Sequence, residues 1–329
     1  MEENNVTTLF EWLDKTTAMV ETHSNEPYLD SLSIVLDIAF YERVSEFEDE
    51  ILIHKMDKAI KELAIESYGT EEIRKAVQLV ILKGMKNSTQ QQHLMTPETV
   101  ALIMGYLASK LTENLESIRL FDPACGTGNL LTIVMDHLKQ PLATFASDVD
   151  STLIKLALAN ANLQKKDITF FHQDSLRPLL LDPVDLTIAD LPVGYYPDDV
   201  QASEFELKAK EGHAYSHHLF IEQGVRYTKD GGYLIFVVPN SLFETEQAKE
   251  LHRFIHQYAH IIGFLQLPES LFKSQTNAKS ILIIQKKGNH TAAPKQPLLV
   301  KLPSFKHTHA MEDVLAQMNS WFASYQKRS

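Results

Sequence analysis

The sequence predicts an α/β protein in which helices cover both faces of a mostly parallel sheet and a small helical domain comes first. Short β-type runs alternate with helical stretches from residue 118 to residue 286, a pattern typical of parallel sheets. Residues 1–88 instead carry apolar residues at helical spacing and no β alternation. The polar motifs of the chain follow β-type runs, and ligands of such sheets bind outside the carboxyl ends of the strands.

Length and composition exclude several classes of protein. The 329 residues, 44% of them hydrophobic, suffice for one large domain and a smaller one. No apolar run approaches the roughly 20 residues that span a bilayer, and the acidic amino terminus is unlike a secretory signal. The one cysteine, Cys125, excludes an intrachain disulfide and fits a reducing compartment. We therefore expect a cytoplasmic protein without membrane association.

The negative charge is concentrated in the first part of the chain. The formal net charge is −12, and residues 1–88 alone hold 18 acidic and 9 basic residues. Residues 286–329 are basic, with 7 basic and 2 acidic residues. Because tight DNA binding requires neutralisation of phosphates, this balance disfavours a protein that clamps DNA on its own.

A helical domain of three to five helices is expected over residues 1–88. Three segments carry apolar residues at helical spacing: residues 29–39, 51–65 and 73–82. Between the last two, Gly69 provides a stop and Thr70 an N-cap with acids in the next turn. The polar residues 86–93 read as a linker. The second domain then covers residues 89–329.

The second domain opens with a helix and continues with alternating strands and helices. Thr96 is a good N-cap and Pro97 a good first residue for a helix that includes residues 100–107. Seven β-type runs follow: residues 118–121, 143–147, 168–172, 184–189, 232–238, 262–267 and 280–285. Helical stretches lie between most of them: residues 130–138, 151–163, 215–227 and 244–258. The core of this domain is thus expected over residues 96–287.

A carboxyl-terminal extension is expected over residues 288–329. Residues 297–302 are compatible with a further strand, and residues 311–325 with an amphipathic helix.

The segment DPACGTGN, residues 122–129, is the most informative motif. It joins an apolar β-type run to a helical stretch, and its glycines allow close approach of a ligand to the backbone. The acid at its start disfavours a phosphate and suits an ammonium group. The spacing fits neither a P-loop nor a G-x-G-x-x-G turn. The alternative is an ordinary strand-to-helix turn with a tight glycine pair.

This segment resembles motif I of S-adenosylmethionine (SAM)-dependent methyltransferases, and most of all that of the N6-adenine DNA methyltransferases. The resemblance implies a class I fold with a seven-stranded, Rossmann-like sheet whose last strand inserts antiparallel, and SAM as cofactor without a metal. It extends over about residues 89–290 and is strongest with the bacterial YtxK-like group and the methylating subunits of type I restriction systems. The cofactor-binding residues it implies are Thr96, Asp122, Pro123, Ala124, Gly126, Gly128, Asn129, Asp148, Asp174 and Ser175.

Two further acids lie where β-type runs end. Asp148 can accept hydrogen bonds from vicinal ribose hydroxyls, whereas Asp150 is expected to cap the following helix. Asp174 can accept a bond from the adenine amino group, or form an Asx turn instead. The resemblance matches Asp148 to motif II and Asp174 to motif III. For Thr96 it implies contact with the methionine part of SAM, while the plain alternative is a capped helix.

Residues 189–197, ADLPVGYYP, lie where the family carries motif IV, and the resemblance implies that Asp190, Pro192 and Tyr195 are catalytic. An acceptor at Asp190 would hold the N–H groups of a target amine and aim its lone pair at the methyl group, with a rigid proline beside it. The family's first proline is replaced by Leu191 and its aromatic by Val193. Stacking on a flipped base would then need the ring of Tyr195, or that of Tyr196 next to it.

Three functions remain open at this level. The first is a SAM-dependent methyltransferase for an exocyclic amino group such as that of adenine in DNA. The second is a SAM-binding regulatory protein that lost base chemistry, and the third is a methyltransferase for a protein or RNA acceptor. A DNA target would require a partner subunit to read it, because the chain holds no insertion of about 100 residues for that purpose. The oligomeric state is left open.

No metal site is expected. The densest histidine cluster, His213, His217 and His218, lacks cysteine partners and reads as a helix start with surface histidines. Cys125 has no visible base to activate it as a nucleophile.

Overall fold

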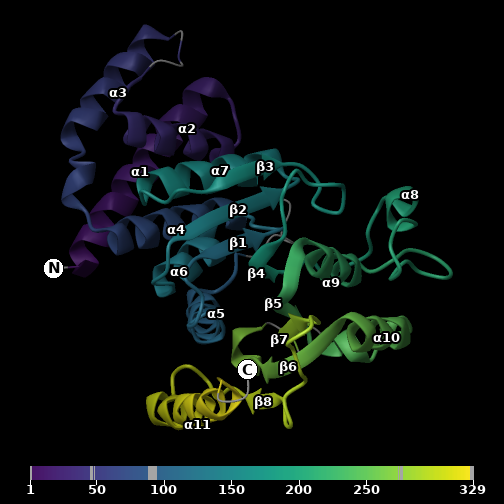
Figure 1. Ribbon diagram of the computed structural model, residues 1–329. Helices are drawn as coiled ribbons and strands as arrows, with labels where there is room; N and C mark the ends of the chain where they lie inside the picture. Colours follow the sequence, from purple (N-terminus) through teal and green to yellow (C-terminus); the bar gives the residue numbers. More distant parts are fainter. Residues whose placement is uncertain are drawn as a thin grey trace.

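The computed structural model describes residues 2–44, 47, 49–87, 95–272, 274 and 277–326. The first part of the chain forms a helical unit, as predicted from its spacing of apolar residues (Figure 1). Its helices are α1 (Glu2–Ser24), α2 (Tyr28–Tyr41), α3 (Glu50–Glu62) and α4 (Thr70–Asn87), with a short 3₁₀ turn, η1 (Ile65–Ser67), before α4. Most of the expected linker falls at residues 88–94, outside the described residues.

Local side chains fix the starts of these helices. Asp49 precedes α3, and its carboxylate accepts hydrogen bonds from the amides of Ile51 and Leu52. At α4 the predicted N-cap, Thr70, is instead the first helical residue. The amide of Gly69 donates to the carboxylate of Glu72 at 2.8 Å. The glutamate three residues on therefore does part of the capping expected of the threonine.

The sheet has eight strands rather than the seven predicted, in the order β3-β2-β1-β4-β5-β7-β6-β8 (Figure 1). The strands are β1 (Ile118–Asp122), β2 (Leu142–Asp148), β3 (Thr169–His172), β4 (Val184–Asp190), β5 (Thr228–Pro239), β6 (Ala259–Gln266), β7 (Lys279–Lys286) and β8 (Leu298–Lys301). The eighth is the further strand that residues 297–302 allowed; it pairs with β6 in parallel and closes the edge of the sheet. Only β7 runs against its neighbours among the described strands, inserted between β5 and β6 as the resemblance implied.

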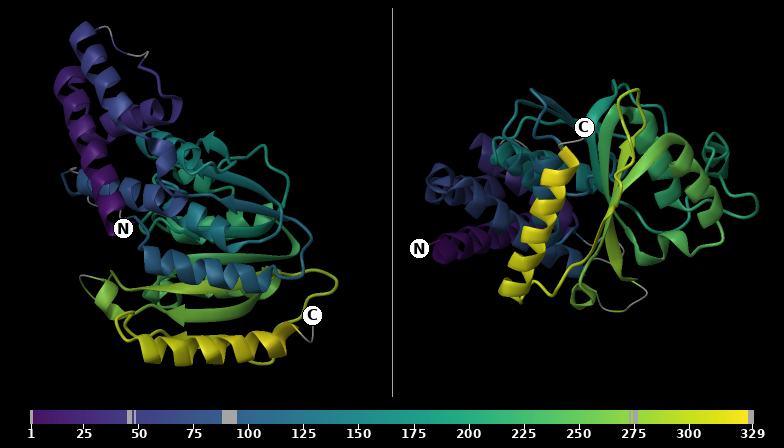
Figure 2. Two further views of the ribbon diagram at one scale, coloured as in Figure 1. Left: turned by 90° about the vertical axis from the view of Figure 1, so that its left-hand side faces the viewer. Right: turned by 60° about the horizontal axis from the view of Figure 1, so that its bottom comes forward.

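Alternate side chains of each central strand enter different cores. On β5, Ile235 and Val237 pack with one set of helices, whereas Leu234 and Phe236 pack with another. The first set is α5 (Glu98–Leu111), α6 (Asn129–His137), part of α7 (Ser151–Leu163) and α11 (Thr308–Gln326). The second set is α9 (Ser216–Tyr227) and α10 (Ala248–Tyr258). Figure 2 shows α11 and these two helices on opposite sides of the sheet.

The helical unit shares a core with α7, one of the helices that cover the sheet. Leu156, Ala159 and Leu163 of α7 are buried in the same apolar cluster as α1–α4. The hydroxyl of Thr152 at the start of α7 donates to Asp30 of α2 at 2.7 Å. The two parts of the chain therefore meet through a continuous apolar contact. No described helix combines the length and apolarity that a membrane span requires.

Candidate active site

Three acidic side chains converge at the carboxyl edge of the sheet. Asp122 ends β1, Asp148 ends β2 and Asp190 ends β4, and these strands are neighbours in the sheet. Asp122 is buried, and burial together with the negative charges of Asp148 and Asp190 raises the pKa of its carboxyl well above the usual range. The topology thus brings together carboxylates that are far apart in the sequence.

The glycine turn is tied to two of these acids. One oxygen of Asp122 accepts the amide of Ala124 at 3.0 Å, and one oxygen of Asp148 accepts the amide of Gly126 at 2.8 Å. Gly126 and Gly128 have φ values of 54° and 75°, which favour glycine. A Cβ at Gly126 would meet nothing within 4 Å, so the backbone there borders open space. The turn can therefore approach a ligand closely.

Two buried oxygens at this turn lack a partner among the described residues. They are Oδ2 of Asp122 and Oδ1 of Asn129, the first residue of α6. The amide nitrogen of Asn129 is occupied, since it donates to the carbonyl of Thr96 at 3.1 Å. Buried polar atoms almost always have partners. Two orphaned acceptors beside open backbone therefore fit a ligand with an ammonium group.

The predicted acids after β2 and β3 differ in their surroundings. Asp148 also accepts the amide of Asp150 at 2.9 Å, and Asp150 caps α7 as predicted. Asp174 accepts the amide of Leu176 at 2.9 Å, which is the Asx turn left open above. Its other oxygen accepts the hydroxyl of Tyr196 at 2.5 Å. Asp174 is thus already engaged from two sides.

Pro123, Ala124 and Ser175 lie at the base of the glycine turn. Ser175 is buried, and its hydroxyl donates to the carbonyl of Pro123 at 2.6 Å. This bond joins the segment after β3 to the segment after β1. The side chain of Ser175 therefore stabilises the glycine turn.

Asp190 is held by two side chains from distant parts of the chain. The hydroxyl of Thr96 donates to its Oδ2 at 3.0 Å, and the ammonium of Lys279 donates to its Oδ1 at 2.6 Å. The plain alternative, in which Thr96 caps a helix, is wrong, because Pro97 occupies the N-cap position of α5 without a side-chain bond. The threonine hydroxyl turns to Asp190 instead.

Lys279 was missed by the sequence reasoning. The sequence shows it only as the residue before a predicted strand, residues 280–285, in a segment that resembles the methylating subunits of type I restriction systems. Because β7 is antiparallel to β5, its first residue lies at the carboxyl edge beside Pro239. The antiparallel direction of β7 therefore places the ammonium of Lys279 at the same edge of the sheet as the acids that end the parallel strands.

The residues after Asp190 present one exposed ring. Leu191 is buried, whereas Pro192 and Val193 are exposed. Tyr195 is 56% exposed and stacks on Tyr215, with ring centroids 4.8 Å apart and an interplanar angle of 17°. Tyr196 turns inward to Asp174, as described above. Of the two tyrosines considered for stacking, Tyr195 is the accessible one.

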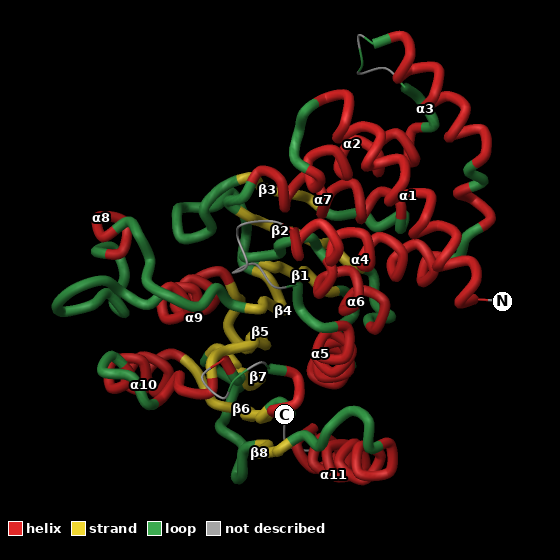
Figure 3. The backbone as a smooth tube through the Cα atoms, turned by 180° about the vertical axis from the view of Figure 1, so that it is seen from behind, coloured by secondary structure: helices red, strands yellow, loops and turns green. Residues whose placement is uncertain are grey.

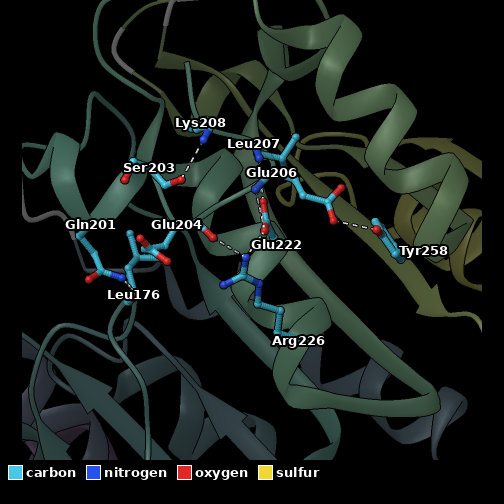
Figure 4. A network of polar contacts seen from close by, with 10 residues as sticks. All are labelled: Leu176, Gln201, Ser203, Glu204, Glu206, Leu207, Lys208, Glu222, Arg226 and Tyr258. Carbon is cyan, nitrogen blue, oxygen red and sulfur yellow. Dashed lines mark hydrogen bonds and ion pairs between the residues drawn. The ribbon is translucent and has the colours of Figure 1, made fainter. Parts of the chain in front are cut away.

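The segment between Tyr196 and α9 is anchored by a buried carboxylate. It carries the short helix α8 (Asp199–Ala202) and extends away from the sheet beside α9 (Figure 3). Glu222 of α9 is 1% exposed and accepts the amides of Glu206 and Leu207 at 3.0 and 2.8 Å. The guanidinium of Arg226 also donates to the carboxylate of Glu222, at 2.5 Å (Figure 4). This network fixes the outer segment against α9.

The histidine cluster is not a surface feature, contrary to expectation. His213 is exposed and bonds Asp199, but His217 and His218 are 2% and 0% exposed. Burial, together with the charges of His218 and Lys279, lowers the pKa of His217 to about 3. Burial lowers the pKa of His218 to about 4. The error arose because two adjacent polar residues at a helix start resemble a solvated turn.

Cys125 is buried within the glycine turn. Burial and the neighbouring charges of Asp122 and Asp148 raise the pKa of its thiol well above the usual range. The thiolate form that a nucleophile needs is thereby disfavoured.

Comparisons with known proteins identify the family. Residues 56–318 match the family model of the N-6 DNA methylases, and residues 7–85 match that of the YtxK N-terminal helical domain. The chain is 43% identical to the Bacillus subtilis protein YtxK over 325 residues, which cover 98% of this chain and 99% of that protein.

Two solved structures share the fold. A Listeria monocytogenes structure bearing the name of a class I SAM-dependent methyltransferase has a TM-score of 0.91 and 41% identity, and the match covers 97% of this chain and 99% of that one. The methyltransferase subunit of a type I restriction-modification system from Streptococcus thermophilus has a TM-score of 0.65 and 15% identity, with 96% and 74% covered. The chain thus has a methyltransferase fold and belongs to the N-6 DNA methylase family, with the helical amino-terminal domain of YtxK.

Proposed function

We propose that this protein is a SAM-dependent N-methyltransferase that transfers the methyl group to an amino group held by Asp190. The observation that carries the proposal is the convergence of Asp122, Asp148 and Asp190 at the tips of three neighbouring strands. Membership of the N-6 DNA methylase family supports the same reaction class.

The glycine turn and its acids form the cofactor side of the proposed site. The free oxygen of Asp122 accepts the ammonium of the methionine moiety, and Asn129 offers a second acceptor beside it. Asp148 faces the ribose hydroxyls. Asp174 and Ser175 border the adenine. When bound, SAM supplies a methyl group on a sulfonium centre, which is a strong electrophile.

Asp190 and its surroundings form the acceptor side. Its oxygens, already oriented by Thr96 and Lys279, have further lone pairs that accept N–H bonds from a target amine. These bonds aim the nitrogen lone pair for an in-line displacement, so that most of the acceleration comes from positioning and electrostatics. Pro192 stiffens the backbone two residues after Asp190, and the exposed ring of Tyr195 stacks on a planar acceptor.

Adenine in DNA is the first acceptor to consider, because of the family. The Streptococcus thermophilus relative is named as a subunit of a restriction-modification system, and we propose that this chain likewise meets DNA through a partner. Val193, exposed where the family pattern carries an aromatic, favours two other candidates. One is a methyltransferase for an amide or amine in a protein or RNA, and the other is a regulatory protein that needs SAM binding alone.

Calorimetry with SAM tests the cofactor side. We expect the protein to bind SAM and Asp122→Ala to bind it at least 100-fold more weakly, because the cofactor ammonium loses its carboxylate. Asp182→Ala, at an exposed acid away from the glycine turn, is the control. Absence of heat with the unmodified protein contradicts the proposal.

Radiolabelled SAM offered in parallel to DNA, RNA and protein from a cell extract tests the acceptor side. We expect label in one of the three fractions, and loss of that label with Asp190→Ala although SAM still binds. Undiminished transfer by this variant would reject the role given to Asp190. Binding without transfer to any fraction supports the regulatory candidate.

A further inference from the structure

The ion pair between Asp190 and Lys279 lies on the acceptor side of the proposed site. The two groups are 2.6 Å apart, and their side chains are only 14% and 28% exposed. Asp190 stands opposite Val237 on β5, and Lys279 stands opposite Pro239, two residues farther toward the carboxyl edge. The ammonium therefore reaches Asp190 from beyond the carboxyl end of β4, on the side that we propose for the methyl acceptor.

Among the described residues, Lys279 forms its ion pair with the carboxylate of Asp190. The nearby imidazole of His217 is buried and neutral at physiological pH, because its pKa lies at about 3. Thr96 holds the second oxygen of Asp190 with a neutral hydroxyl. The pair Asp190–Lys279 is thus close to electrically neutral as a unit.

We propose that Lys279 is a positioning residue that fixes Asp190 and neutralises it toward the cofactor sulfur. This inference rests on the proposed function. A lone carboxylate at this position would attract the sulfonium of SAM but not the neutral thioether of S-adenosylhomocysteine (SAH), the product that remains after methyl transfer. With Lys279 in place, the pair Asp190–Lys279 carries almost no net charge. The carboxylate oxygens of Asp190 therefore accept hydrogen bonds from the target amine and do not attract the cofactor sulfonium.

The ratio of the SAM and SAH affinities tests the inference, because the two ligands differ only by the methyl group and the charge at sulfur. In Lys279→Met, we expect this ratio to rise about tenfold, as a like charge is removed and the carboxylate is left unpaired. In Asp190→Asn, the unpaired ammonium should lower the ratio by a similar factor. The double variant should return it close to the value of the unmodified protein.

Matched variants separate charge from folding. Lys286→Met removes a lysine at the other end of the same strand, and we expect it to leave the ratio unchanged. Lys279→Arg keeps the charge and should keep the ratio. Unchanged SAH affinity in each variant shows that the pocket is still folded.

The outcomes distinguish this inference from the proposed function. If the unmodified protein binds neither SAM nor SAH, both are overturned. If it binds both ligands but Lys279→Met keeps the original ratio, or Lys279→Arg changes it as the methionine variant does, this inference alone is overturned. An equal change in Lys286→Met would also overturn it, because the effect would not be specific to the pair.

Discussion

At the scale of single residues, folding disfavours the ionised form of the buried carboxyl of Asp122. It has one hydrogen bond, from Ala124, and one orphaned oxygen, and it lies near the negative charges of Asp148 and Asp190. Its pKa is therefore raised in the folded protein. Such a group is ionised in the unfolded chain over a pH range in which the folded chain still holds its proton, so stability falls as pH rises through that range. The carboxylate that we propose binds the cofactor therefore lowers the stability of the folded protein.

Asp122→Asn should therefore stabilise the protein while weakening SAM binding. The amide keeps an acceptor for Ala124 and removes the charge, and we expect a gain of about 1–3 kcal/mol in the free energy of unfolding at pH 7.5. The gain should shrink as pH falls toward 3, below the pKa of about 3.9 in the unfolded chain, where the carboxyl is neutral in both states. Urea unfolding across this range provides the measurement, with the exposed Asp182→Asn as control. A destabilised Asp122→Asn at pH 7.5 would contradict this account.

At the scale of elements, helix α9 begins with two buried histidines. His217 and His218 follow Ser216, the first residue of the helix, and their rings pack beside Tyr215. Burial disfavours their protonated forms, and the positive end of the helix dipole disfavours a cation there as well. Lys279 adds to the effect at His217, whereas Glu250 opposes it at His218. Both pKa values are lowered relative to the unfolded chain.

Acid should therefore destabilise the protein through α9. A lowered histidine pKa means that the unfolded chain binds more protons, so stability is lost as pH falls below about 6.5 toward the folded values. At pH 5 the loss is about 2 kcal/mol for each histidine. We expect the pH dependence of unfolding between pH 7 and 5 to be much shallower in His217→Gln/His218→Gln. His213→Gln, at the exposed histidine, should retain the full dependence; equal slopes in both variants would refute the assignment.

At the scale of the whole molecule, α7 joins the helical unit to the sheet. Leu156 is fully buried in the core formed with α1–α4, whereas Leu158 on the same helix is 44% exposed. The acidic helical unit thus packs on α7 through apolar side chains, with the hydrogen bond from Thr152 to Asp30 beside them. The sequence pattern changes at the predicted domain boundary, residue 88, but one apolar cluster contains residues from both sides of it.

Leu156→Ala should destabilise both parts of the molecule together. Removal of a buried leucine costs about 2–5 kcal/mol, and because the core is shared, we expect one cooperative transition at lower urea concentration. Leu158→Ala should cost less than about 0.5 kcal/mol. Circular dichroism and tryptophan fluorescence measured together provide the readout, since Trp12 lies in α1. Two separate transitions in Leu156→Ala would show that the helical unit folds independently.

The sequence by itself determined the features that depend on neighbours along the chain. The period of apolar residues placed the first four strands to within about one residue at each end, and turn chemistry identified the glycine turn and the cap at Asp150. These predictions were correct because backbone preference and side-chain alternation are local properties. The resemblance added the antiparallel insertion of β7, which no local pattern contains.

Only the tertiary structure decided which distant residues meet. Thr96 and Lys279 reach Asp190 across 94 and 89 residues of sequence, and neither contact leaves a trace in local spacing. The burial of His217 and the pairing of β8 with β6 likewise depend on which surfaces face each other. Such contacts are set by the order of strands in the sheet, a property of the whole chain, and they decide which oxygens of the site remain available for a ligand.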